Sequence, residues 1–345
     1  MIIVRAPLRV SFFGGGTDHP DWFESSGKGA VLSTSINKYV YIQLRRIPNV
    51  FDFSYRVVWR EVEQTKSIAE IKHPVVRAVL SHYREANDPG FEVVYNADLP
   101  ARSGLGSSSA FTVAMLNALM FERGHYVSSK ELAQKAIYVE QDLLGEPVGC
   151  QDQVAVAVGG LNRIDFHTRQ DFSVSPIALS GERSQALESS LMMFFTGFTR
   201  SASNIEVEKK KNFDQKAKEL TRMYEMVQEG QSILLNASTD LSEFGKLLHE
   251  GWLAKRSLAS SVSSGPIDEA YQAALNAGAY GGKLLGAGGG GFLLFMVPPH
   301  KRTAVAEALR DLVPVPIKFS REGTKVVLFD PELSGNYETT PLVSA

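Results

Sequence analysis

The side chains best suited to chemistry lie in one short stretch, Arg102 to Ser109, which reads Arg-Ser-Gly-Leu-Gly-Ser-Ser-Ser. It follows a strand-like run at 91–95 and precedes an apolar, helix-like run at 110–121. Glycines let a backbone approach a ligand closely, and a helix N-terminus offers unpaired N–H donors and the positive end of a dipole. The stretch therefore favours a phosphate cradle, while a serine-capped helix after a glycine turn stays open as the structural alternative.

Two acidic side chains stand near the ends of predicted helices. A Ser-Ser-Lys-Glu capping box at 128–131 opens a helix that runs to about 144, and Glu140 lies near its end. A Gly/Pro turn at 145–149 then places Asp152 at the start of another apolar helix. Each carboxylate could serve a site, but Glu140 could equally be a solvated helix residue and Asp152 a favourable N-terminal charge. Cys150, beside Asp152, is either a small packed side chain or a reactive thiol.

Two further segments are rich in glycine. The first, Gly14-Gly15-Gly16-Thr17-Asp18, ends in a carboxylate that could bind sugar hydroxyls or cap the turn. The second, at 281–291, contains G-x-G-x-x-G but leads into a β-run at 292–297. A dinucleotide fingerprint needs a helix after it, so we reject that interpretation. So many glycines favour close passage of the backbone past a partner.

The composition describes a chain able to bury a sizeable core. It has 345 residues, 44% of them hydrophobic, and a net charge of −2, which gives no basic field for nucleic acid. No apolar run approaches the ~18 residues of a membrane span, and the N-terminal apolar run is too short for a signal peptide. The single cysteine excludes an internal disulfide and fits a reducing compartment. A soluble cytoplasmic enzyme is expected. The sequence has no His/Cys cluster with zinc-ligand spacing, no Walker loop and no G-x-S-x-G motif, which argues against a zinc site, a Walker-type nucleotide site and the common serine hydrolase elbow.

The chain length suggests two domains. A polar, Ser-rich stretch at 170–188 marks the boundary, which gives predicted domains at 1–180 and 181–345. Residues 1–13 are predicted to form a pair of strands broken at Pro7, and the tail at 331–345 is expected to be poorly ordered.

Three glycine-rich motifs in this order are more specific than any one of them. Segments 7–18, 100–110 and 284–292 resemble the three signature motifs of the GHMP kinases, a superfamily that includes galactokinase, homoserine kinase and mevalonate kinase. The resemblance runs from Ile2 to about Phe329. Segments 12–18, 71–77 and 282–292 are most similar to the branch acting on D-glycero-D-manno-heptose 7-phosphate. Gly15 and Gly16 stand where galactokinases have Glu-His, which speaks against galactose.

The resemblance implies an α+β GHMP kinase fold. Its N-terminal part would be like ribosomal protein S5 domain 2, its C-terminal part would be ferredoxin-like, and the active site would lie between them. It implies Mg²⁺ at Ser108 and Glu140, Asp152 as the base, and Arg9 as the cation that pairs with it. Trp59-Arg60 replaces a Tyr-Ser pair of the family, so the adenine contacts stay open. The ATP phosphates would be bound by Arg102, Ser103, Gly104, Leu105, Gly106, Ser107, Ser108 and Ser109.

The implied reaction is ATP-dependent phosphorylation of the anomeric C1 hydroxyl of the heptose 7-phosphate. Its 1,7-bisphosphate product leads toward GDP-heptose and surface polysaccharide. Alternatives are a kinase for L-fucose or galactose, a mevalonate-type decarboxylase, and a non-catalytic sugar or ATP sensor. The expected partner is a small sugar phosphate, with no nucleic acid and no membrane, and a homodimer stays open. The substrate-binding candidates are Gly14, Gly15, Gly16, Thr17, Asp18, Lys28, Arg200, Lys283, Gly288 and Gly289, with Arg200 first for the 7-phosphate.

Overall fold

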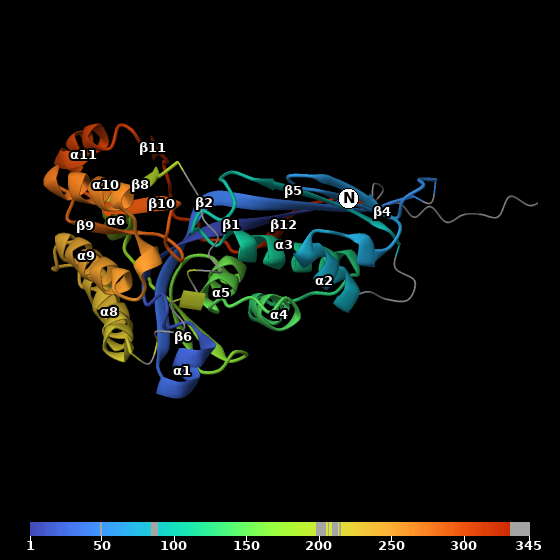
Figure 1. The fold of residues 1–345 in the computed structure, drawn as a ribbon, viewed down its shortest axis with the longest axis horizontal. Coiled ribbons are helices and arrows are strands. Elements are labelled where there is room, and N and C mark those ends of the chain that lie inside the picture. Colours follow the sequence, from blue (N-terminus) through green and yellow to red (C-terminus); the bar gives the residue numbers. More distant parts are fainter. Residues whose placement is uncertain are drawn as a thin grey trace, which may run out of the picture.

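The computed structural model describes residues 1–48, 50–83, 89–197, 205, 207–208, 213 and 215–331. Within these residues, the larger of two sheets has eight strands in the order β12-β1-β2-β5-β3-β4, and β6 and β7 extend from the first half of β2 (Figure 1). The strands are β1 Ile2–Phe13, β2 Gly29–Arg46, β3 Tyr55–Val58, β4 Val62–Thr65, β5 Phe91–Ala97, β6 Leu161–Phe166, β7 Phe172–Pro176 and β12 Lys325–Phe329.

The predicted strand break at Pro7 is wrong. β1 runs unbroken from Ile2 to Phe13 between β2 and β12, and its register against β2 shifts between Pro7 and Leu8. Proline has no N–H to donate to a sheet, and a bulge is one of the places where a strand tolerates it. The irregularity lets one long strand connect the core of the sheet to the first glycine-rich turn.

Helices cover one face of the larger sheet (Figure 1). The central one, α3, is apolar on all sides, and nearly all of its side chains are buried against the sheet and its neighbouring helices. Ser128 caps α4 by accepting a hydrogen bond from the Glu131 N–H, as the capping box predicts. The helices of this part are α1 Pro20–Ser26, α2 Pro74–Tyr83, α3 Ser107–Glu122, α4 Ser129–Tyr138 and α5 Gln151–Val158, with a π-helical turn, η2, at Val139–Leu143.

The C-terminal part has its own antiparallel sheet, in the order β11-β8-β10-β9. With helices between β8 and β9 and between β10 and β11, this order is the ferredoxin-like arrangement. The strands are β8 Leu191–Phe195, β9 Gly281–Leu284, β10 Phe292–Met296 and β11 Val313–Pro314. The helices are α6 Gly181–Ser190, α8 Ala217–Leu235, α9 Ser242–Arg256, α10 Gly265–Asn276 and α11 Arg302–Ala308, with short 3₁₀ turns at Ser260–Val262 and Pro299–Lys301. A further 3₁₀ turn, Ile68–Glu70, precedes α2 in the N-terminal part.

The two parts share a hydrophobic core. The Phe244 ring of α9 packs edge-on against Phe12 and Phe13 at the end of β1, with ring centroids 5.3 and 5.0 Å apart. The chain also crosses back, because β12 pairs with β1 in the larger sheet. The last strand of the predicted 181–345 domain therefore belongs to the N-terminal sheet, where it covers an edge of β1 that would otherwise be unpaired.

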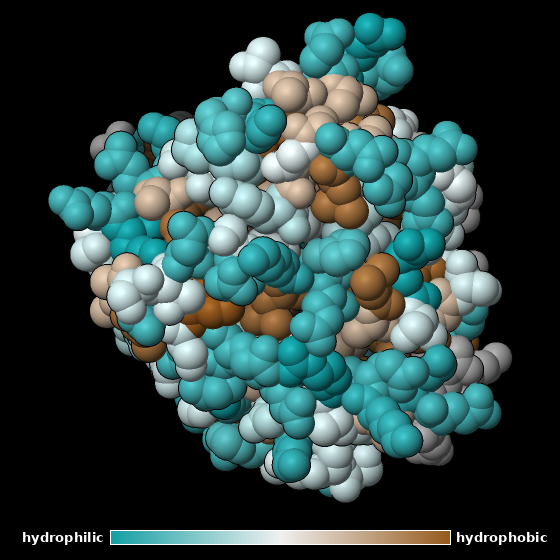
Figure 2. Space-filling model, turned by 90° about the vertical axis from the view of Figure 1, so that its left-hand side faces the viewer, coloured by the Kyte–Doolittle hydropathy of each residue, from teal (hydrophilic) through white to brown (hydrophobic). Residues whose placement is uncertain are grey.

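The end of the molecule formed by the C-terminal part is mostly hydrophilic. Figure 2 shows apolar side chains there only in small groups between polar ones. Such scattered groups are normal for a protein surface. Among the described helices, none is both long and apolar enough to cross a bilayer.

His73, which caps α2, gives the fold a pH dependence. Its ring stacks on Phe111 with centroids 4.4 Å apart and meets the edge of Trp59 at 4.7 Å, and burial lowers its pKa to about 4. The unfolded chain binds a proton on this imidazole below about pH 6.5, whereas the folded protein binds it only near pH 4. The free energy of unfolding should therefore fall by about 2.5 kcal/mol as the pH drops from 6.5 to 4.

Urea unfolding at several pH values checks this, with His73→Asn as the comparison. Nδ1 of His73 accepts a hydrogen bond from the Val76 N–H, and asparagine can keep this cap without titrating. The variant should lose about that much of the pH dependence. The same slope in both proteins would show that His73 does not cause it.

Candidate active site

A cavity of about 240 Å³ lies where the two parts of the chain meet. All three glycine-rich segments reach it: the first glycine loop (14–18), the middle glycine loop (102–109) and the third glycine loop (285–291). Sequence reasoning therefore identified segments that converge in space. The predicted site residues that line the cavity are Arg9, Gly15, Gly16, Asp18, Arg102, Gly104, Gly106, Ser107, Ser108, Ser109, Glu140, Asp152, Lys283 and Gly288.

Other predicted site residues support the loops from behind the cavity wall. Thr17 Oγ1 donates 2.8 Å hydrogen bonds to the carbonyl oxygens of Gly14 and Ala30, which holds the first glycine loop. Ser103 Oγ donates to the Pro100 carbonyl at 2.6 Å, and the Leu105 carbonyl accepts from the Arg9 N–H at 3.0 Å. Similarly, the Gly289 N–H donates to the Val262 carbonyl at 2.9 Å.

The predicted phosphate-binding cations Lys28, Arg200 and Lys283 have different outcomes. Lys28 is exposed, just after α1, and does not line the cavity. Arg200 lies outside the described residues. Lys283 does line the cavity, and its Nζ donates a 2.7 Å hydrogen bond to the Phe12 carbonyl.

The third glycine loop packs backbone to backbone on the middle one. A Cβ atom on Gly286 would lie 2.3 Å from Cα of Gly104, and one on Gly291 would lie 2.2 Å from the Ser103 carbonyl oxygen. Gly104 itself has φ +87°, a left-handed conformation that favours glycine. These contacts explain the glycine density. The middle loop then leads into α3, whose first residue is Ser107, so the helix N-terminus faces the cavity.

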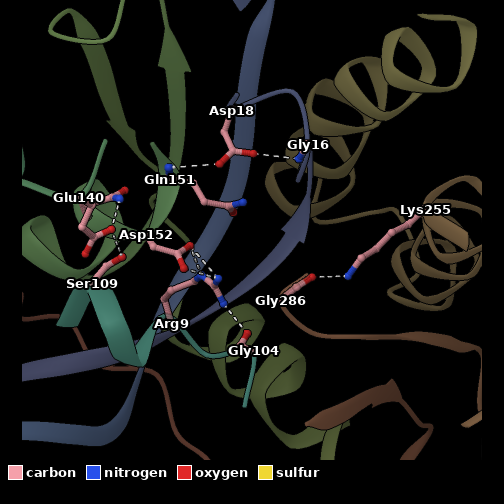
Figure 3. A network of polar contacts seen from close by, with 11 residues as sticks. Arg9, Gly16, Asp18, Gly104, Ser109, Glu140, Gln151, Asp152, Lys255 and Gly286 are labelled. Carbon is pink, nitrogen blue, oxygen red and sulfur yellow. Dashed lines mark hydrogen bonds and ion pairs between the residues drawn. The ribbon is translucent and has the colours of Figure 1, made fainter. Parts of the chain in front are cut away.

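Arg9 and Asp152 form a bidentate ion pair at the centre of the site (Figure 3). Nε and Nη2 of Arg9 each donate a 2.7 Å hydrogen bond to a different oxygen of Asp152. Nη1 donates to the Gly104 carbonyl at 2.6 Å, so Arg9 ties β1, α5 and the middle glycine loop together. Arg9 is only 4% exposed, but Asp152 is 24% exposed and is accessible from the cavity. Bidentate pairing fixes the orientation of the carboxylate.

Glu140 lies in the π-helical turn, where the nearby Thr112 hydroxyl favours the charged form of its carboxylate against the effect of burial. Ser109 Oγ donates to Oε2 at 2.9 Å and Gln153 Nε2 donates to the same atom, while Oε1 is buried and accepts no hydrogen bond from the described residues. Burial raises the pKa of Glu140 to about 8, and the nearby charge of Glu146 acts in the same direction. A buried acid of this kind suits a cation.

The donor set fits a hard divalent cation that brings other ligands with it. Glu140 offers a carboxylate oxygen, and Ser108, exposed in the same cavity, offers a hydroxyl. In the described part of the chain, no group of three or more His, Cys, Asp or Glu side chains could hold a metal by itself. Mg²⁺ typically takes one or two protein ligands and completes its shell with phosphates and water.

Asp18 caps two elements at once. Its Oδ1 accepts a 2.8 Å hydrogen bond from the Gly16 N–H, and its Oδ2 accepts one of 3.3 Å from the Gln151 N–H at the start of α5. A Cβ on Gly149 would lie 1.9 Å from Oδ2, so glycine is required there. Asp18 therefore caps the turn, as one of the two interpretations of the sequence predicted, and its carboxylate also lines the cavity.

Sequence reasoning missed several residues of the cavity wall. Lys255 of α9 is buried, and its Nζ donates to the carbonyl oxygens of Leu284, at 2.9 Å, and Gly286. A lysine in the last turn of an amphipathic helix gives no sign of such burial. Glu146 also lines the wall; burial raises its pKa, and the charge of Arg102 opposes that shift. Ser11, His19, Gln151 and Gln153 are further wall residues beside the recognised motifs.

Cys150 is a packed side chain and lies outside the cavity wall. Burial raises the pKa of its thiol to about 12, and Gln141 Nε2 donates a hydrogen bond to Sγ at 3.3 Å. The thiolate is the reactive form, so this cysteine is unreactive at neutral pH.

Comparison with known proteins finds the family that the three motifs resemble. Residues 73–160 match the family model of the GHMP kinases N terminal domain, and residues 232–315 match that of the GHMP kinases C terminal. A D-glycero-alpha-D-manno-heptose 7-phosphate kinase from Campylobacter jejuni is 29% identical over 320 residues, which cover 90% of this chain and 93% of the relative. A mevalonate kinase from Pyrococcus horikoshii is 26% identical over 351 residues, covering 94% and 97%.

The fold is also shared with solved structures. The structure of a D-glycero-D-manno-heptose 1-phosphate kinase from Bacteroides thetaiotaomicron superposes with a TM-score of 0.76 at 24% identity. The match covers 96% of this chain and 100% of that one. The predicted α+β architecture of two parts is confirmed.

Proposed function

Because this chain belongs to the GHMP kinases, we propose that it transfers the terminal phosphoryl group of ATP to a hydroxyl group of a sugar phosphate. The observation that carries the proposal is the Arg9–Asp152 pair, which stands in one cavity with a glycine-rich loop at a helix N-terminus. Phosphoryl transfer needs positioning and charge stabilisation more than covalent help. This cavity offers both.

The middle glycine loop would bind the ATP phosphates. Its backbone and the N-terminus of α3 provide N–H donors, and Ser107, Ser108 and Ser109 add hydroxyl groups. Ser108 and Glu140 would hold Mg²⁺, which neutralises charge on the phosphates. Ser109 and Gln153 orient the Glu140 carboxylate through Oε2 and leave Oε1 for the cation.

Asp152 would accept the proton of the attacking hydroxyl group. Arg9 holds this carboxylate in one orientation and places a positive charge where an alkoxide would develop. For an anomeric hydroxyl, which is more acidic than an ordinary alcohol, partial proton transfer would suffice. The exposed side of Asp152 opens to the cavity, where the acceptor would lie.

We propose D-glycero-D-manno-heptose 7-phosphate as the acceptor and its C1 hydroxyl as the nucleophile, a step toward GDP-heptose and surface polysaccharide in the cytoplasm. Support comes from the Campylobacter jejuni relative, which is named for this substrate. Asp18, with the backbone of the first glycine loop, would bind sugar hydroxyls. The buried cations Lys255 and Lys283 in the wall are candidates for the distal phosphate.

An ADP-release assay over a panel of acceptors tests the proposal. The panel should hold the heptose 7-phosphate, the heptose 1-phosphate, L-fucose, galactose and mevalonate. Release that depends on the heptose 7-phosphate and exceeds that with the other acceptors is expected. A protein that binds ATP but releases no ADP with any of them would instead be a sensor on the same fold.

A further inference from the structure

We propose that Ser11 and Gln151, on either side of Gly15, form a subsite for neighbouring hydroxyl groups of the acceptor and select a polyol. The identity of the acceptor rests on the proposed function. Ser11 belongs to β1 and Gln151 to the first turn of α5, so the subsite connects two elements that already carry Arg9 and Asp152. Both side chains line the cavity.

The backbone of the turn does not require glycine at position 15, and the missing side chain leaves an open space there. Gly14 has φ +84° and is tightly packed, since a Cβ there would lie 1.9 Å from the Ala30 carbonyl oxygen. Gly16 has φ +103°. Gly15 has neither restriction, and its Cβ would make only ordinary contacts, 3.6 Å from Gln151 Nε2 and 4.0 Å from Ser11 Oγ. What glycine provides at this position is room, and the room is bounded by two polar side chains.

The polar atoms around this space lack partners. Ser11 Oγ and Gln151 Oε1 are buried and make no hydrogen bond with any described residue, and the same is true of His19 Nδ1 in the same wall. Ser11 is 6% exposed and His19 3%. Buried polar atoms in native proteins are nearly always hydrogen-bonded, so several in one cavity indicate a polar ligand.

The chemistry of these atoms matches a polyol. Gln151 Oε1 can only accept, and His19 Nδ1 is an acceptor when Nε2–H donates to the Pro147 carbonyl, 3.2 Å away. The Asp18 carboxylate adds further acceptor capacity. Gln151 Nε2 and the Ser11 hydroxyl, the polar atoms nearest the space beside Gly15, can also donate. A ligand with several hydroxyl groups, each of which both donates and accepts, matches this mixture of acceptors and donors.

The subsite is also close to the reacting group. Gln151 precedes Asp152, and its N–H is bonded to Asp18 Oδ2. In the view of Figure 3 the Gln151 side chain lies between the Asp18 carboxylate and the Arg9–Asp152 pair. A sugar ring held here would present a hydroxyl group toward Asp152, so Gln151 would position the acceptor and leave the chemical step to its neighbour.

Calorimetric titration of D-glycero-D-manno-heptose 7-phosphate into the protein saturated with MgADP tests the subsite. Gly15→Ala places a methyl group in the space, and Gln151→Leu removes the amide. Each should raise the Kd of the sugar phosphate about 10-fold or more, with the ADP affinity unchanged. Gly181→Ala, at a glycine with open space around it, and Gln272→Leu, on the surface of α10, are the matched controls and should bind like wild type.

Wild-type affinity for the sugar phosphate in both variants would overturn the proposal. So would loss of ADP binding together with sugar binding, or a wild-type protein that does not bind the sugar phosphate at all. The proposed function fails separately. If the variants lose binding as expected but the wild-type protein releases no ADP, the subsite stands and the kinase reaction does not.

Discussion

Asp152→Asn should lower kcat by about 10²–10⁴-fold, the usual contribution of a general base, while the affinity for ATP stays near that of wild type. Asparagine keeps the size of the side chain and one acceptor for Arg9, but it cannot take a proton from the acceptor hydroxyl. Arg9 also remains bonded to the Gly104 carbonyl, so the middle glycine loop should keep its shape. Steady-state kinetics together with an ATP titration separate the two effects.

The control for this variant is Asp311→Asn, a surface change remote from the cavity wall, which should leave kcat unchanged. If Asp152→Asn turned over at the wild-type rate, Asp152 would not be the base. Loss of ATP binding in Asp152→Asn would instead assign the ion pair a role in holding the loop.

Glu140→Gln should raise the Mg²⁺ concentration needed for half-maximal activity by at least about 10-fold and lower kcat/KM by about 10²–10³-fold. An amide oxygen is a weaker ligand for a hard cation than a carboxylate. The fold should tolerate the change, because burial already disfavours the charged form of this acid and glutamine resembles the neutral one.

Electron paramagnetic resonance in the presence of ADP measures the affinity of the site for Mn²⁺ without turnover. Glu182→Gln, an exposed change on α6, serves as the control. Equal Mn²⁺ affinity in wild type and Glu140→Gln would remove Glu140 from the metal site.

Local signals made the middle of the site predictable. The residue types at 91–121 predict a strand, a glycine turn and a helix that begins with serines. The structure has β5 and α3 at these positions. The glycine density at 281–291 predicted close backbone approach, and Gly286 does lie against Gly104. In the first case the cause is the set of unpaired N–H groups at a helix N-terminus, and in the second it is the absence of a Cβ atom in glycine. Both are local properties of the residues.

The remaining features depend on contacts between distant segments. Pro7 signals a break only if the strand is considered alone; within the sheet the break becomes a bulge. β12 pairs with β1 because that edge of the larger sheet is free. The residues near β12 in the sequence give no sign of this pairing. Lys255 is held in the site by the carbonyl oxygens of Leu284 and Gly286, about thirty positions further along the chain. Lys28 was predicted from its charge alone, and it is exposed and does not line the cavity.

Phosphorus NMR of a reaction containing the wild-type protein, MgATP and D-glycero-D-manno-heptose 7-phosphate tests the central claim most directly. We predict a new sugar phosphate signal coupled to the anomeric proton, appearing in equal amount to ADP while the 7-phosphate signal persists. Inorganic phosphate as the only new product besides ADP, or ATP that stays intact with this sugar, would contradict transfer to C1.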